Sequence, residues 1–170
     1  MHKKLATILM GVMGAAAAFA ANEAPQDGAL AFPKDYPYWA TFLRNVQRPD
    51  VQQVRELYVS PIGTRAKSGE PFPTGTIFVM ENHQALPSPT GSPNPGPIAK
   101  IFVMQKVDGK PAGVPEGLQN GSWVYGSFSA DGKAIAENYQ ACRGCHLPLA
   151  QKDFVQRYDE YFEKRATVNQ

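Results

Sequence analysis

The pattern of apolar and polar positions predicts helices toward both ends of the chain. Residues 32–47 begin with turn residues, and their later apolar residues share one helical face: Trp39, Phe42, Leu43 and Val46. Residues 153–165 give a second amphipathic pattern, whose apolar face is formed by Phe154, Tyr158, Tyr161 and Phe162. A further helix is expected within residues 131–146, up to a pair of cysteines.

The middle of the chain predicts β-strands. Four short segments there are rich in β-branched and aromatic residues and are bounded by turn residues: 51–60, 76–81, 98–107 and 121–129. Residues 83–97 are rich in proline and glycine and are expected to form a loop. Strands in the middle with helices at both ends predict an α+β domain, mainly an antiparallel β-sheet with flanking helices.

The first 20 residues resemble a secretory signal peptide. Lys3 and Lys4 precede a short, alanine-rich apolar run, and small residues stand at positions 18 and 20. A retained membrane anchor is the alternative, but the run is short for a membrane span. We therefore expect residues 1–20 to be removed, residues 21–170 to form one domain, and the mature protein to be periplasmic.

The charge balance gives little indication of a partner. Lys3 and Lys4 account for two of the 17 basic residues, which leaves 15 basic and 15 acidic residues after cleavage. A nucleic-acid-binding protein would be expected to carry a basic stripe, so this class is excluded. No later apolar segment is long enough to cross a bilayer.

The segment Cys142-Arg-Gly-Cys145-His146 carries the chemistry of the chain. Cys-x-x-Cys-His is the attachment pattern of c-type haem, because two nearby thiols can add to the two vinyl groups of one porphyrin. His146 can then bind the iron from one side. Zinc, a redox-active dithiol and a disulfide are the alternatives, but only His83 and His146 remain as histidines after residue 20, and their spacing is unlike that of a zinc finger.

Four segments, in this order, resemble the cytochrome P-460 and cytochrome c′-beta family. They are "FPKDYPYW" (residues 32–39), "VRELYV" (54–59), "PFPTGTIFVMEN" (71–82) and the Cys-x-x-Cys-His motif. The resemblance implies a mainly antiparallel sheet with helices packed around it, frequently a homodimer, and one haem whose distal face is lined by the sheet.

Met80 is the main departure from this family. In the cytochromes P-460, which oxidise hydroxylamine, a lysine on the matching strand is crosslinked to the haem, and a thioether cannot supply that amine. In the cytochromes c′-beta the iron is five-coordinate and binds NO or CO. A methionine can instead bind the iron opposite His146, which raises the reduction potential and suits electron transfer. Core packing is the ordinary role of a strand methionine, for Met80 and for Met104 alike.

Strand alternation assigns the neighbours of Met80 to two faces. Thr76, Phe78, Met80 and Asn82 share one face, and Ile77, Val79, Glu81 and His83 share the other. Phe78 is therefore expected to line the haem pocket, and Glu81 to point away from it. His83 stays open as an alternative sixth ligand, because it begins the expected loop.

Arg55 matches an arginine near the distal pocket in the cytochromes P-460. This match implies contact with a haem propionate or a bound anion, whereas an exposed strand arginine is the alternative.

Together these features predict a periplasmic monohaem cytochrome with His146 and Met80 as axial ligands, acting in electron transfer with a redox partner protein. A five-coordinate or labile-methionine protein that binds NO or CO is the alternative. An oxidoreductase of hydroxylamine or NO is a third possibility, which Met80 disfavours.

Overall fold

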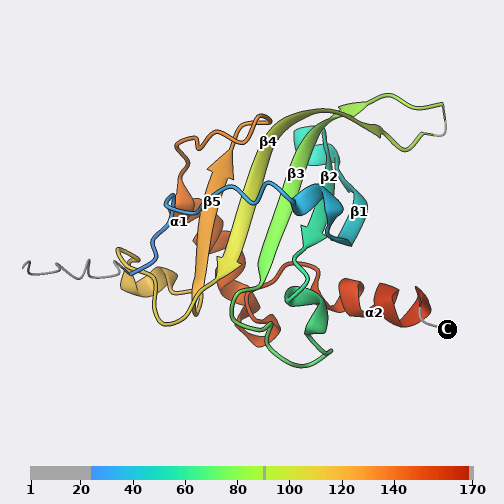
Figure 1. Ribbon diagram of the computed structural model, residues 1–170. Coiled ribbons are helices and arrows are strands. Elements are labelled where there is room, and N and C mark those ends of the chain that lie inside the picture. Colours follow the sequence, from blue (N-terminus) through green and yellow to red (C-terminus); the bar gives the residue numbers. More distant parts are fainter. Residues whose placement is uncertain (1–23, 90, 169–170) are drawn as a thin grey trace, which may run out of the picture.

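The fold is a single antiparallel sheet whose five strands follow one another in space in the order of the sequence (Figure 1). The structure, a computed structural model, describes residues 24–89 and 91–168. The strands are β1 (Ala40–Arg48), β2 (Gln53–Val59), β3 (Ile77–Leu86), β4 (Asn94–Lys106) and β5 (Trp123–Phe128). The predicted α+β class with a mainly antiparallel sheet is confirmed. The expected signal peptide lies outside the described residues.

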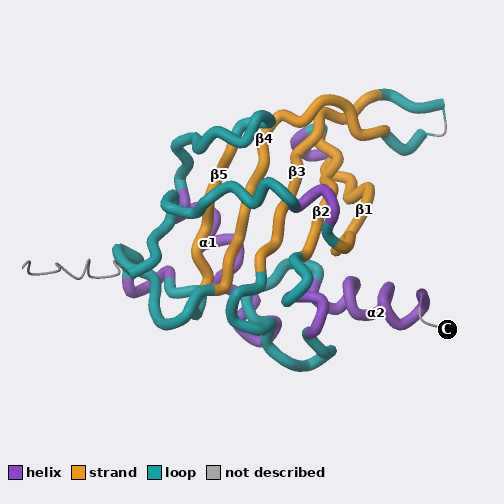
Figure 2. The backbone as a smooth tube through the Cα atoms, in the orientation of Figure 1, coloured by secondary structure: helices purple, strands orange, loops and turns teal. Residues whose placement is uncertain are grey.

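The two α-helices of the described residues lie on one face of this sheet (Figure 1). The α-helices are α1 (Tyr139–His146) and α2 (Tyr158–Val168). The short 3-10 helices are η1 (Tyr36–Tyr38), η2 (Pro49–Val51), η3 (Gly63–Arg65), η4 (Glu116–Leu118) and η5 (Leu147–Lys152). The N-terminal segment crosses the opposite face (Figure 2). In the described part of the chain, none of the helices has both the length and the apolar character that a membrane span needs.

The helix expected over residues 32–47 is wrong, because this region forms the turn η1 and the strand β1. The pairing of β1 with β2 shifts register twice, between Thr41 and Leu43 and between Leu43 and Val46, and Asn45 has a left-handed φ of 53°. Such bulges interrupt the strict alternation of a strand. Phe42, Leu43 and Val46 can therefore all be buried, with a spacing that resembles that of a helix.

The loop expected over residues 83–97 is mostly strand. β3 continues to Leu86, and β4 begins at Asn94. Ile101 is the first residue of β4 that pairs with β5, so the preceding part of β4 has a free edge. A free edge tolerates proline, which cannot donate a backbone hydrogen bond, and Pro95 and Pro97 lie there.

Both C-terminal helices are shorter than predicted. α1 begins only at Tyr139, where the Asn138 side chain accepts a hydrogen bond from the Ala141 amide, so residues 131–138 are not helical. α2 begins only at Tyr158, because Asp153, Phe154 and Arg157 before it have left-handed φ angles. The four aromatic residues predicted on one helical face nevertheless all pack against the same core cluster.

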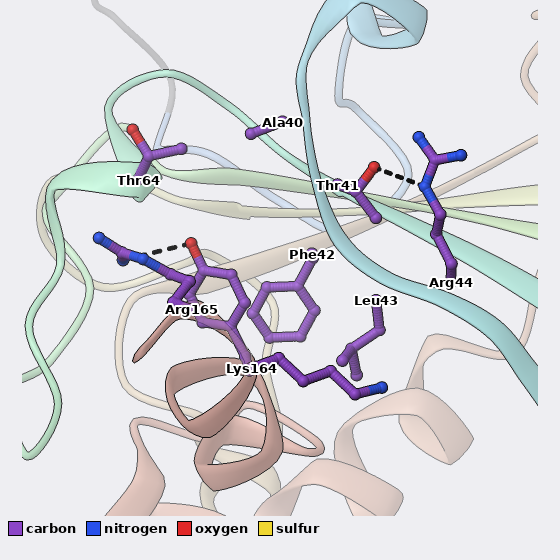
Figure 3. A pocket seen from close by; sticks show the side chains of 9 residues that line it. Ala40, Thr41, Phe42, Leu43, Arg44, Thr64, Lys164 and Arg165 are labelled. Atoms are coloured by element: carbon purple, nitrogen blue, oxygen red, sulfur yellow. Dashed lines mark hydrogen bonds between the residues drawn. The ribbon is translucent and has the colours of Figure 1, made fainter. Parts of the chain in front are cut away.

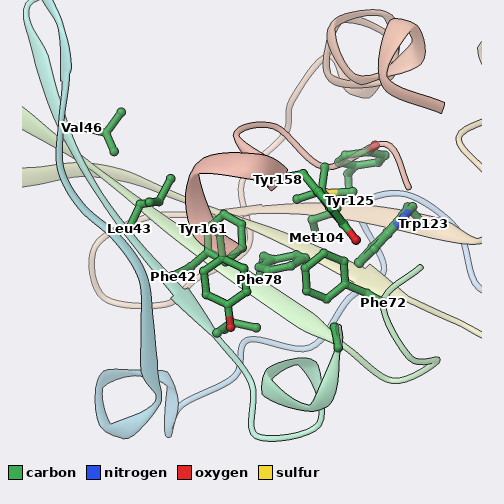
Figure 4. Close-up of a cluster of buried hydrophobic side chains, with 13 residues drawn as sticks. Phe42, Leu43, Val46, Phe72, Phe78, Met104, Trp123, Tyr125, Tyr158 and Tyr161 are labelled. Atoms are coloured by element: carbon green, nitrogen blue, oxygen red, sulfur yellow. The ribbon is translucent and has the colours of Figure 1, made fainter. Parts of the chain in front are cut away.

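That cluster, the inner core, lies between the sheet and the C-terminal elements (Figure 4). Phe78 contacts Phe42 and Phe72 with ring centroids 4.8 and 4.9 Å apart, and Phe42 stacks on Tyr161 at 4.2 Å. Aromatic pairs in these geometries add to the energy of apolar burial. A second cluster on the other face packs Val79, Ile101, Val103 and Phe128 under the N-terminal segment.

Glu81 anchors a polar network on this second face. Tyr36 and Tyr58 donate to its carboxylate at 2.6 and 3.3 Å. His83 Nε2 lies 3.0 Å from the same carboxylate, and Nδ1 donates to the Gly96 carbonyl at 2.7 Å. Glu81 therefore points away from the face that carries Met80, as strand alternation predicts.

This network should make the fold sensitive to alkaline pH. Burial and the Glu81 carboxylate raise the pKa of Tyr58 to about 12, and burial also raises the pKa of Tyr36. A raised folded-state pKa contributes stability below the ordinary tyrosine value of about 10 and loses it as the pH rises toward 12. The free energy of unfolding should fall from pH 10 upward, and less steeply in the double variant Tyr36→Phe/Tyr58→Phe.

Denaturant unfolding followed by circular dichroism between pH 8 and pH 11.5 measures this slope. Tyr38→Phe is the matched control, because Tyr38 is 91% exposed. Equal slopes in the double variant and in the wild type would contradict the prediction.

Candidate cofactor-binding site

A cavity of about 610 Å³ lies between the inner face of the sheet and the helix α1. All five strands contribute to one wall: Phe42, Val46, Gln53, Arg55, Leu57, Phe78, Met80, Asn82, Phe102, Met104 and Tyr125. The other wall is formed by Cys142, Cys145 and His146 of α1 and by Val155, Gln156 and Arg157. The structure therefore brings the six residues predicted to hold the cofactor to one cavity: Arg55, Phe78, Met80, Cys142, Cys145 and His146.

His146 is oriented by a backbone hydrogen bond. Its Nδ1 lies 2.6 Å from the carbonyl oxygen of Phe154. A carbonyl only accepts, so Nδ1 carries the proton and Nε2 keeps its lone pair. Burial lowers the pKa of His146, and the bond to Phe154 only partly opposes this. The side chain is therefore a neutral imidazole with one nitrogen free to bind a metal.

The two cysteines lie one helical turn apart on α1. Residues three apart in a helix share a face, so both sulfurs border the cavity beside His146. Cys142 is half-buried, Cys145 is exposed, and both are free thiols. Burial is the main cause that raises the pKa of Cys142 to about 11, which keeps this thiol neutral.

Arg143, between the cysteines, points to the opposite side of α1 and is 1% exposed. Its guanidinium donates to both carboxylate oxygens of Asp27, at 2.6 and 2.8 Å, and to the Trp123 carbonyl at 3.0 Å. It also lies 5.1 Å from the ring centre of Tyr125. These contacts of Arg143 were not predicted from the sequence. The one feature that could have indicated them is a positively charged residue between the two cysteines.

Breaking this anchor should destabilise the protein strongly. Arg143→Leu leaves the Asp27 carboxylate without its partner, and loss of one member of a buried ion pair costs about 3–5 kcal/mol. Because the Asp27 side chain is 16% exposed, we expect a loss toward the lower end of this range, about 3 kcal/mol. Denaturant titration measures the change in the free energy of unfolding.

Lys133→Leu is the control, because the ion pair of Lys133 with Asp131 is exposed and should leave stability unchanged. Asp27→Ala should lower the free energy of unfolding by a similar amount. If the double variant Asp27→Ala/Arg143→Leu loses no more than either single variant, the effect belongs to the Asp27–Arg143 ion pair. An Arg143→Leu protein as stable as the wild type would contradict the anchor.

Met80 faces the cavity from the middle of β3. Phe78 and Asn82 line the cavity on either side of it, whereas Glu81 and His83 do not. The alternative of His83 as an axial ligand therefore loses support. Met104 also borders the cavity, but it is 8% exposed and packed in the inner core. Met80 is half-buried and outside that cluster, so its thioether is the one available to a bound group.

One end of the cavity is polar. Arg55 on β2 pairs in register with Asn82 on β3. Arg55 Nε, Asn82 Oδ1 and Gln53 Oε1 are buried without a hydrogen-bond partner among the described residues. Because buried polar groups are nearly always paired, these atoms mark a place for an ordered water or for a polar group of a bound molecule. Arg55 is thus placed in the cavity rather than on an exposed strand surface.

These features fit a haem. The volume lies within the usual range for cofactor sites, about 300–1,000 Å³. The aromatic and aliphatic interior suits a porphyrin, the arginine end suits its carboxylates, and His146 borders the interior from the helix wall. In the described ranges no group of three or more His, Cys, Asp or Glu side chains gathers as a metal site, so the zinc alternative finds no support.

A second pocket of about 590 Å³ lies between β1 and α2 (Figure 3). Phe42, Leu43 and Tyr161 contribute apolar surface, and Arg44, Lys164 and Arg165 contribute cations. The cysteine motif and Met80 do not border it, so it is separate from the candidate site.

The cavity, the motif and the neutral imidazole define the class of c-type haem proteins. The sequence profile described as Cytochrome P460 matches residues 33–157, which is most of the chain. The chain therefore belongs to the cytochrome P-460 family, as the resemblance of its four segments predicted. A search of curated proteins gives no match.

Proposed function

We propose that this chain is a periplasmic electron-transfer cytochrome with one haem c, attached through Cys142 and Cys145 and bound at the iron by His146 and Met80. One observation carries the proposal: His146 and Met80 line opposite walls of one cavity. The hydrogen bond of Nδ1 to Phe154 leaves Nε2 of His146 free for the iron. Bound haem supplies a one-electron iron couple.

The nature of Met80 supports electron transfer over enzymatic turnover. A neutral, soft thioether favours ferrous iron and raises the reduction potential. With bound haem, His146 and Met80 would supply both protein ligands of the iron, so its oxidation state could change with little rearrangement. A thioether has no amine, and the lysine crosslink of the hydroxylamine-oxidising relatives is therefore impossible at Met80.

The remaining cavity residues would hold the porphyrin. Phe78 offers an aromatic contact beside Met80, and Arg55 Nε offers a donor for a propionate at the polar end. Successive residues on one face of a strand are roughly 7 Å apart, which places Asn82 toward the porphyrin edge if Met80 lies over the iron.

Secretion and a partner protein complete the proposal. Residues 1–20 support export, and a periplasmic location suits covalent haem attachment. The exposure of Cys145 supports an accessible porphyrin edge on this side, through which a redox partner could exchange electrons. Homodimer formation is proposed from the family resemblance alone.

Binding of NO or CO is the second candidate function. Leu57, Phe78 and Phe102 give the sheet wall an apolar and aromatic surface, and Met80 lies outside the packed core. A methionine that leaves the iron would uncover this surface to a small neutral gas.

Visible absorption spectra of the purified holoprotein, with and without CO, decide between the two functions. A low-spin ferrous spectrum that CO does not change, with a weak far-red sulfur-to-iron band in the ferric form, supports methionine ligation. A high-spin ferrous spectrum that shifts promptly with CO would replace electron transfer by gas binding.

A further inference from the structure

The backbone that holds His146 adopts an unusual conformation. Three non-glycine residues between η5 and α2 have left-handed φ angles: Asp153 (51°), Phe154 (60°) and Arg157 (56°). Non-glycine residues rarely adopt this region, and they persist there only when surrounding contacts impose it. The segment presents the Phe154 carbonyl to His146 Nδ1 at 2.6 Å, so the contacts that impose its shape also position the histidine.

Asp153 supplies those contacts. Lys106 on β4 donates to both of its carboxylate oxygens, at 2.9 and 2.8 Å. The Phe72 amide donates to the same carboxylate at 2.8 Å, and Trp123 Nε1 donates to the Asp153 backbone carbonyl at 2.8 Å. One residue is thus tied to two strands and to the chain before β3.

The ion pair is shielded from solvent. The side chains of Lys106 and Asp153 are each 12% exposed, and the Lys106 ammonium lies 5.6 Å from the ring centre of Trp123. A charge pair this buried is strong only while both partners remain, because an isolated charge there would be poorly solvated. The pair therefore fixes the peptide that joins Asp153 and Phe154.

We propose that Asp153 and Lys106 are positioning residues that set the strength of the bond between His146 and the haem iron. The inference rests on the proposed function, in which Nε2 of His146 binds the iron. A hydrogen bond from Nδ1 to a carbonyl makes the imidazole a stronger donor. Stronger donation stabilises ferric iron and lowers the reduction potential. The Asp153–Lys106 pair thus tunes the iron from a distance, without touching the haem.

The test compares Asp153→Asn with the wild-type holoprotein. Asparagine keeps the size of the side chain but loses the charge that binds Lys106, so the Phe154 carbonyl should move away from His146. We expect the midpoint potential to rise and the iron–histidine stretching frequency to fall. In proton NMR, the Nδ1 proton of His146 should exchange with deuterium about tenfold faster, as expected for loss of one net hydrogen bond.

The stretching frequency is read in five-coordinate ferrous protein. It is measured in the wild-type background if that iron is five-coordinate, and in the Met80→Ala background if methionine occupies the sixth position. Either coordination state therefore permits the measurement.

Asp159→Asn is the matched control. It makes the same chemical change in the nearby but exposed pair of Asp159 with Lys152, whose atoms are 2.7 Å apart, and should leave all three readouts unchanged. If Asp153→Asn does not accumulate as folded protein, Lys106→Gln serves as the second test variant. It should shift the readouts in the same direction, and Lys106→Arg should restore them.

The outcomes separate this inference from the proposed function. Imidazole ligation in the wild type, together with unchanged readouts in Asp153→Asn or Lys106→Gln, would overturn the inference alone. Equal shifts in the Asp159→Asn control would also overturn it. Wild-type spectra without imidazole ligation would overturn the proposed function and the inference with it.

Discussion

Replacement of Met80 by alanine should convert the ferrous protein from low spin to high spin and open it to CO. The variant removes the thioether that β3 presents to the cavity, and alanine leaves space for a diatomic gas. The midpoint potential should fall by at least about 100 mV, a fraction of the roughly 0.8 V that axial ligands control. Absorption spectroscopy with CO titration, followed by spectroelectrochemistry, measures both effects.

Met104→Leu is the control for this experiment. It removes the other cavity sulfur while nearly conserving volume, so the spectrum should be unchanged and the cost in stability should stay below about 1.5 kcal/mol. A Met80→Ala spectrum identical to the wild-type spectrum would show that Met80 is not a ligand. A high-spin Met104→Leu protein would transfer the ligand role to Met104.

The double variant Cys142→Ser/Cys145→Ser should lose all covalently bound haem. These are the only cysteines in the sequence, so no other thiol can replace them. Haem staining on a denaturing gel, with the intact mass of the chain, measures the loss. The single variants Cys142→Ser and Cys145→Ser are the controls, because each retains one thiol for attachment.

Covalent haem in the double variant would contradict attachment through this motif. Retention of covalent haem by the wild type and by both single variants would instead assign one bond to each cysteine. The three proteins together therefore test the two attachment points separately.

The central strands could be predicted because each is a short β-branched or aromatic segment bounded by turn residues. The orientation of Met80 followed from strict alternation in β3, and the placement of Glu81 on the other face agrees with it. Alternation failed in β1, where the bulges around Leu43 and Asn45 change the spacing of buried residues. Periodicity therefore predicts an element reliably only where pairing is regular.

The contacts that hold α1 could not be predicted from the sequence. Asp27 and Arg143 are 116 positions apart, and no local pattern links them. The partner of His146 is a backbone carbonyl, which every residue has, so the identity of Phe154 gave no signal. Long-range ion pairs and main-chain acceptors depend on the complete fold, whereas the Cys-x-x-Cys-His motif is local and can be read directly.

The two margins of the sheet differ in their exposure to other chains. The N-terminal segment covers the margin at β5, where the Gly28 amide donates to the Tyr125 carbonyl at 2.8 Å. At the other margin β1 has no further strand beside it in the described part of the chain, but it is bulged and carries the exposed Arg44 and Asn45. Bulges and charges on an edge strand oppose the addition of a neighbour's strand, which protects against aggregation. A homodimer of this protein should therefore assemble through a surface other than the open edge of its sheet.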